Sequence, residues 1–301
     1  MGMILRVLGG ADYVSQISDG YAIVLTSLFA PATYCFMFIS GFFGMQFSFK
    51  KLLMMESWLI VCSLLTFFLG SFLFGGFSII DLIKDFFPIS TRRWWFMTYY
   101  MLIFIMTPLL NKGIEILDKK DFLKILLLLI GYQIMSFLQF QSSAGSNFLS
   151  LLTVYLLGRY CNLYDFKLSK NKSLWIFISS WAILLLLMFL CDNYNKKVIF
   201  KLLNYNTPLL MLMSVSLFYY VKGLPPIKSK VINKGLKTVL FIYLITDGFY
   251  VPFYKWLAHI LEVNLFLGLG LVLLIVVLSM LFGWVIMLMS GLLINKMCYE
   301  K

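Results

Sequence analysis

The chain has 301 residues, of which 61% are hydrophobic and only 13% charged, and its formal net charge is +12. A soluble domain is about a quarter charged, so this composition excludes a soluble protein of this size. The basic residues lie in short loops between apolar runs, which indicates orientation in a membrane and argues against nucleic-acid binding. The sequence therefore predicts an all-α, polytopic transmembrane helical bundle surrounded by a lipid bilayer.

Apolar runs recur along the whole chain. Because a membrane span needs about 20 residues, we expect about nine spans in a single domain over residues 1–301. The expected spans are 21–45, 52–75, 94–110, 122–140, 146–163, 173–191, 205–221, 238–260 and 264–294. The run 238–260 is interrupted by Asp247, Gly248 and Pro252. Such a break needs protein or a water-filled cavity over the freed backbone groups, so it indicates either a site or a structural kink.

Lysine and arginine are divided unevenly between alternate loops, with 17 in one set and 8 in the other. The larger set includes Lys50, Lys51, Arg159 and Lys222. Loops rich in these residues stay in the cytoplasm. We therefore expect the N-terminus outside and the C-terminus in the cytoplasm. The first twenty residues do not read as a cleavable signal peptide. A chain that begins outside without one is what the loss of a preceding helix would produce.

Few residues offer catalytic chemistry. His259 is the single histidine, and Asp247 is an acid inside an expected span. Both are weak candidates for a catalytic base, against the simpler interpretations of an interfacial histidine and a kinked helix. The five cysteines are scattered and form no CxxC or His/Cys cluster, so we expect no metal site.

A basic and aromatic segment opens the expected span 94–110. Arg92 and Arg93 precede Trp95 and Tyr99. Aromatic rings stack on sugars, and arginine binds carboxylate or phosphate through two hydrogen bonds, so the segment is a candidate glycan or lipid-phosphate site. An aromatic belt with arginines that anchor to headgroups is the alternative interpretation.

Four segments, in this order, resemble motifs of the acyltransferase-3 family of integral membrane O-acyltransferases, in the branch found in polysaccharide gene clusters. They are FMFISGFF at 36–43, the Pro-Ile, Trp-Phe, Tyr and Pro-x-Leu-Asn stretch within 87–111, YLLGRY at 155–160 and IYLI at 242–245. The motif positions are Ser40, Gly41, Pro88, Asn111, Tyr155, Gly158 and Tyr243.

The resemblance implies transfer of an acyl group, acetyl in the first instance, to a hydroxyl of a surface or capsular polysaccharide or a lipid-linked oligosaccharide. Acyl-CoA, foremost acetyl-CoA, would be the co-substrate, with no tightly bound cofactor. Lys50 and Lys51 would meet the CoA phosphates, and the residues that would meet the glycan are Arg92, Arg93, Trp95 and Tyr99. The location would be a bacterial inner membrane.

The sequence also departs from the family pattern. The family's first helix and its histidine have no equivalent before the segment 36–43, and Thr246 stands where the motif of 242–245 continues with histidine. Only the first position of an Arg-x-x-Arg pair is basic, at Lys50. A truncated or inactive family member is therefore one alternative, a glycan transporter or flippase is a second, and a glycan polymerase ranks last.

Overall fold

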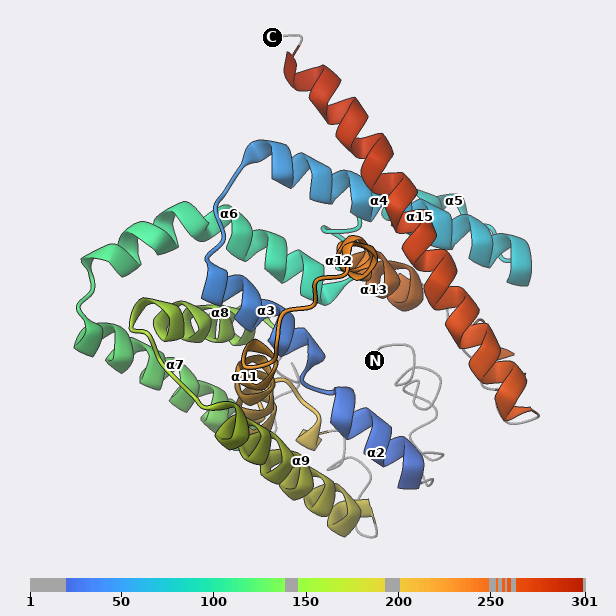
Figure 1. The fold of residues 1–301 in the computed structure, drawn as a ribbon. Coiled ribbons are helices and arrows are strands. Elements are labelled where there is room, and N and C mark those ends of the chain that lie inside the picture. Colours follow the sequence, from blue (N-terminus) through green and yellow to red (C-terminus); the bar gives the residue numbers. More distant parts are fainter. Residues whose placement is uncertain are drawn as a thin grey trace. The chain divides into compact units, whose positions relative to one another are not determined.

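The computed structural model describes residues 20–138, 146–192, 201–248, 253, 256–257, 259–260 and 264–299. Every regular element in these ranges is a helix (Figure 1), which confirms the all-helical class. The chain divides into two compact units, Ala11–Phe47 with Trp95–Pro225, and Ser48–Trp94 with Pro226–Lys301. The single domain expected from the sequence stays a prediction.

The first unit contains seven described helices: α2 (Gly20–Phe29), α3 (Ala32–Phe43), α6 (Trp95–Ile116), α7 (Lys119–Leu138), α8 (Phe148–Leu163), α9 (Lys170–Asp192) and α11 (Pro208–Lys222). The expected span 21–45 is two helices, because Pro31 occupies the position before α3. Proline has no N–H group with which to continue α2, and it is tolerated where a new helix starts. Pro208 begins α11 in the same way.

Two glycines bring the backbones of α3 and α8 into contact. A Cβ atom on Gly158 would lie 2.5 Å from the Phe38 carbonyl oxygen and 2.7 Å from the Phe42 nitrogen, and one on Gly41 would clash with the Tyr155 carbonyl. Small residues at a membrane helix crossing allow this close approach. The motifs at 36–43 and 155–160 therefore form one helix pair at the centre of the first unit.

The contacts of α3 with its neighbours advance together along the chain. On α6, Tyr100 contacts Ser40, and the later residue Asn111 contacts Met45. On α8, Tyr155 lies against Gly41, and the later residue Arg159 lies against Gly44. The helices α3, α6 and α8 therefore run in the same direction. α7 runs the opposite way along α8, because Phe122 contacts Tyr160 whereas Gln133 contacts Ser150.

The second unit contains α4 (Phe49–Phe74), α5 (Ile79–Asp85), α12 (Lys230–Leu236), α13 (Val239–Gly248) and α15 (Leu265–Tyr299). Phe241 of α13 is fully buried, and its ring occupies the space above Gly283 of α15. Trp58 of α4 lies 5.3 Å from the Phe241 ring and donates a 2.7 Å hydrogen bond to the Ser290 hydroxyl. These contacts join α4, α13 and α15.

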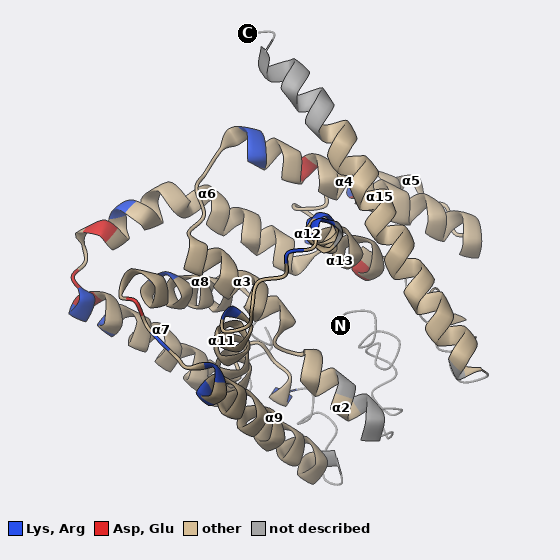
Figure 2. Cartoon of the chain, viewed as in Figure 1, with Lys and Arg blue, Asp and Glu red and all other residues tan. Residues whose placement is uncertain are grey.

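Five helical segments are long and apolar enough to cross a membrane: Thr26–Phe43, Phe49–Phe74, Lys119–Leu138, Lys170–Cys191 and Phe266–Ser290. Three shorter apolar helices, α8, α11 and α13, fall within other expected spans. The count of nine spans is not confirmed, and the orientation of the termini stays a prediction. Figure 2 shows Lys and Arg mainly near helix ends and in turns, with long uncharged stretches between them.

Candidate functional site

A group of polar residues surrounds the last turn of α3, in the first unit. Gly44 ends this helix with a φ of 75°, and the Arg159 guanidinium of α8 lies where a side chain on Gly44 would stand. The Lys222 ammonium lies 4.3 Å from the centre of the Phe42 ring, and Asn162 donates to the Phe42 carbonyl. We call Arg159, Lys222 and Asn162 the cationic corner.

The two cations of this corner have no carboxylate partner among the residues that the structure describes. Nearby lysines do have one: Lys124 is 2.8 Å from Asp121, and Lys167 is 2.7 Å from Asp165. The buried Nε of Arg159 also donates no hydrogen bond to the part of the chain that the structure describes. Both cations lie at the C-terminal end of α3, where the negative end of the helix dipole stabilises a positive charge. Because no carboxylate of the described residues neutralises them, both can bind an anion.

Five of the seven motif positions predicted from the sequence lie on α3, α6 and α8 beside this corner. The Asn111 amide donates a 3.2 Å hydrogen bond to the Met45 carbonyl. The Tyr155 hydroxyl is buried and lies toward the Met45 backbone without the geometry of a hydrogen bond. Ser40 contacts the Tyr100 hydroxyl at 3.5 Å. These motif residues thus lie together along one side of α3.

Trp95 begins α6, and its ring packs at a tilt against another aromatic residue of the first unit. Its ring centroid is 4.7 Å from that of Tyr205, which in turn is 5.6 Å from the ring of Tyr34. Trp95 and Tyr205 are both half-exposed, whereas Tyr34 is fully buried. Tyr99 lies one turn further along α6 and is half-exposed. The predicted glycan-contacting tryptophan therefore belongs to an aromatic group that the sequence did not predict.

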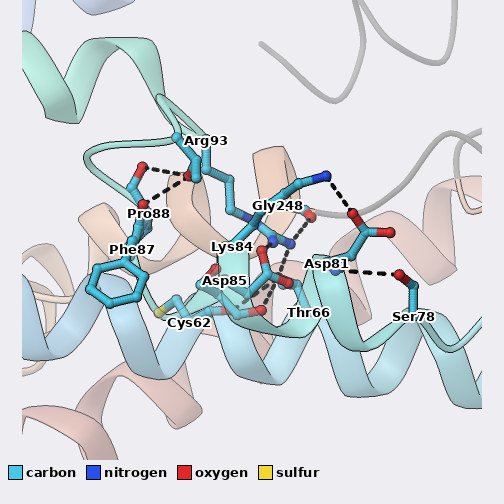
Figure 3. A network of polar contacts seen from close by, with 12 residues as sticks. Cys62, Thr66, Ser78, Asp81, Lys84, Asp85, Phe87, Pro88, Arg93 and Gly248 are labelled. Carbon is cyan, nitrogen blue, oxygen red and sulfur yellow. Dashed lines mark hydrogen bonds and ion pairs between the residues drawn. The ribbon is translucent and has the colours of Figure 1, made fainter.

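Arg93 lies in the second unit, within a buried polar network (Figure 3). Its guanidinium forms an ion pair with Asp85 and donates to the Thr66 hydroxyl at 2.8 Å and to the Gly248 carbonyl at 2.9 Å. The Arg93 and Asp85 side chains are only 12% and 6% exposed. The guanidinium also lies over the Trp94 ring. Arg93 thereby joins α4 and α5 to the last turn of α13.

A second ion pair in Figure 3 is exposed. Lys84 lies 2.9 Å from Asp81, whose backbone N–H donates a hydrogen bond to the Ser78 hydroxyl at the start of α5. The hydrogen bond from Lys84 lowers the pKa of the Asp81 carboxyl. Pro88, a motif position, accepts a hydrogen bond from the Arg93 backbone N–H at 3.0 Å.

The other predicted site residues also belong to the second unit. Lys50 is half-buried and Lys51 exposed, both in the first turn of α4. Asp247 is buried in the last turn of α13, the helix that also carries Tyr243, whereas His259 is exposed. Arg92 is exposed and has a φ of 52°. The described part of the chain holds no group of three His, Cys, Asp or Glu residues that could bind a metal ion.

Sequence reasoning did not predict the cationic corner. Arg159 was treated as part of a motif and, like Lys222, as a cytoplasmic loop charge, although it lies inside α8. An arginine within an apolar helix is itself a signal for a functional residue, because a charge inside a membrane is costly. The partner positions on α3 depend on the tertiary fold and have no sequence signal.

Apolar helices, five of them long enough to cross a bilayer, define an integral membrane protein. A family model described as an acyltransferase domain matches residues 4–288, and the chain belongs to this acyltransferase family. This confirms the family predicted from the motifs. The polysaccharide branch and the missing first helix stay predictions. No curated protein and no solved structure matches the chain.

Proposed function

We propose that the chain is a membrane-bound O-acyltransferase that moves an acyl group, acetyl in the simplest case, from acyl-CoA to a hydroxyl of a surface or capsular polysaccharide or its lipid-linked precursor. The observation that carries the proposal is the family match over residues 4–288. The proposed location is a bacterial inner membrane. The cationic corner supports an anionic donor such as CoA.

Arg159 and Lys222 are proposed to bind phosphates of acyl-CoA. Both are held in place by contacts with α3, and neither is neutralised by a carboxylate within the described ranges. Guanidinium groups bind phosphate through two parallel hydrogen bonds, and lysine adds a point charge. Both residues also belong to the loop set that charge counting places in the cytoplasm, where acyl-CoA would be supplied. Lys50 and Lys51 are proposed as further phosphate contacts.

The proposed reaction is a thioester-to-ester exchange. The acceptor hydroxyl oxygen bonds to the acyl carbon, the carbon–sulfur bond breaks, and the acceptor's proton ends on the CoA sulfur. A general base near the acceptor would take up this proton first. We propose Asp247 as the first residue to test for this role, because it is buried at a helix end, and His259 as the second.

A kinetic experiment tests the donor site. The full chain in lipid nanodiscs would be assayed for release of free CoA from acetyl-CoA with and without glycan acceptor. Each of Arg159→Gln and Lys222→Gln should raise the KM for acetyl-CoA by about tenfold, because a hydrogen bond to a charged group contributes about 1.5–3 kcal/mol. Lys124→Gln, which removes an exposed lysine paired with Asp121, is the matched control.

Two further results bear on the proposal. The double variant Lys50→Gln/Lys51→Gln should also raise the KM for acetyl-CoA, and an unchanged value would remove these lysines from the site. Mass spectrometry of the surface glycan in a deletion strain should show acyl groups that return when the chain is supplied. Acylation that is unaffected by deletion would refute the proposal and favour a transporter.

A further inference from the structure

A group of buried polar side chains lies in the first unit, away from the cationic corner. The Ser150 hydroxyl donates to the Gln133 side-chain oxygen at 2.9 Å, and the Asn206 amide donates to the Ser136 hydroxyl at 3.3 Å. Gln133 and Ser136 are one turn apart on α7 and therefore share a face. The Tyr34 hydroxyl lies toward Ser150 without hydrogen-bond geometry. We call these five residues the amide–hydroxyl cluster.

Three polar atoms of this cluster are buried and make no hydrogen bond with any residue in the described ranges. They are the amide nitrogen of Gln133, the amide oxygen of Asn206 and the hydroxyl of Tyr34. The three side chains are 1%, 2% and 0% exposed. A buried polar group without a partner costs about 1–3 kcal/mol, and native structures contain few of them. Three in one cluster indicate a polar group that this set of residues is built to receive.

The chemistry of the cluster identifies the kind of group. It offers an NH2 group with two N–H donors, one acceptor oxygen and one hydroxyl that can both donate and accept. The hydrogen bonds that connect its members join amides and hydroxyls only. A phosphate or carboxylate would call for cations, and a metal ion would call for carboxylates. A neutral molecule with several hydroxyl groups satisfies the set.

An aromatic pair lies against the cluster. Tyr205 neighbours Asn206 in the chain and contacts the Tyr34 ring, and the Trp95 ring packs against Tyr205 at a tilt of 45°, with 4.7 Å between the ring centroids. Trp95 and Tyr205 are half-exposed, so part of each ring is available to a ligand. An aromatic face binds the C–H face of a sugar ring while polar groups bind its hydroxyls.

We propose that the amide–hydroxyl cluster and the Trp95–Tyr205 pair bind an uncharged sugar unit of the acceptor. The amides of Gln133 and Asn206 bind its hydroxyls, and the aromatic pair stacks on its ring. The role as an acceptor site rests on the proposed acyltransferase function, whereas sugar binding itself does not.

Saturation-transfer NMR on the full chain in nanodiscs tests this site without any acyl-CoA. The probes are the methyl glycosides of glucose, galactose and N-acetylglucosamine. At least one should receive saturation from the protein, and Gln133→Leu and Trp95→Leu should each weaken its binding by about tenfold. Asn233→Leu, which removes an exposed amide of α12 in the second unit, is the control and should leave binding unchanged.

A stability measurement separates a ligand site from a structural one. Gln133→Leu removes an unpaired buried donor, and Ser150 keeps its 3.0 Å bond to Asn147. The variant should therefore unfold within a few degrees of the wild type while losing sugar binding. If Gln133→Leu does not fold, Trp95→Leu still tests sugar binding, because Trp95 is half-exposed and its replacement disturbs the core less.

Each outcome is decisive. No saturation of any of the three glycosides, or equal saturation in wild type and Gln133→Leu, would show that the cluster holds water only and would overturn the inference. Sugar binding in a chain that does not turn over acetyl-CoA would leave this inference standing and refute the acyltransferase proposal. Acyl transfer by the wild type, together with unchanged sugar binding in Gln133→Leu, would support the acyltransferase proposal and overturn this inference.

Discussion

Gly158→Ala tests the contact between α3 and α8. The added Cβ would lie 2.5 Å from one backbone atom of α3 and 2.7 Å from another, where ordinary contact begins at 3.4 Å. Backbone atoms cannot rotate away, so the two helices must separate by about 0.9 Å. A gap of that size loses a quarter to a half of the dispersion energy between the surfaces, and overpacking costs about 1–3 kcal/mol.

Gly131→Ala is the matched control, because Gly131 lies within α7 and has no atom within 4 Å of an added Cβ. Both substitutions gain the same helix propensity, about 1 kcal/mol, so the difference between the variants isolates the clash. We expect the Gly158 variant to unfold roughly 3–10 °C below the Gly131 variant in detergent, followed by tryptophan fluorescence and gel filtration. Equal unfolding temperatures would show that the α3–α8 contact is not as close as described.

Two other contacts lead to stability predictions. Asp85→Asn should destabilise the protein by about 3–5 kcal/mol, because it removes the carboxylate that pairs with the buried Arg93 charge. Lys84→Ala changes an exposed ion pair and should leave the unfolding temperature unchanged. A similar loss of stability in both variants would contradict this reasoning. Trp58→Phe removes the 2.7 Å hydrogen bond to Ser290 and should cost about 1 kcal/mol, measured by thermal unfolding, whereas no loss would mean that this bond contributes nothing net.

Local sequence features predicted the positions of most helices. Runs of apolar residues determine where a membrane helix forms, since every backbone group in lipid must be satisfied within it. The break at Pro31 was not predicted, although proline is a local signal, because the apolar pattern continues through it. The described helix α13 ends at Gly248, and most of the expected span beyond it lies outside the described residues.

The neighbours of the candidate site residues could not be predicted from the sequence, because they depend on tertiary contacts. Arg93 was expected to face a glycan, yet its guanidinium donates to Asp85, Thr66 and Gly248, which come from three separate segments. The position of Arg159 beside Gly44 was not predicted, because it depends on the contact between α3 and α8. Whether Arg93 also contacts a glycan stays a prediction.

The length of α8 has a consequence for how two substrates could meet. Its 16 residues extend about 24 Å at 1.5 Å per residue, less than the hydrocarbon thickness of about 30 Å. A membrane span of this length would require the lipid to thin around it. Ser150 and Arg159 are separated by about 14 Å along the same axis. A sugar at one end and a nucleotide at the other would be divided by roughly half a bilayer, a distance that a flexible thioester arm can span without any large movement of the protein.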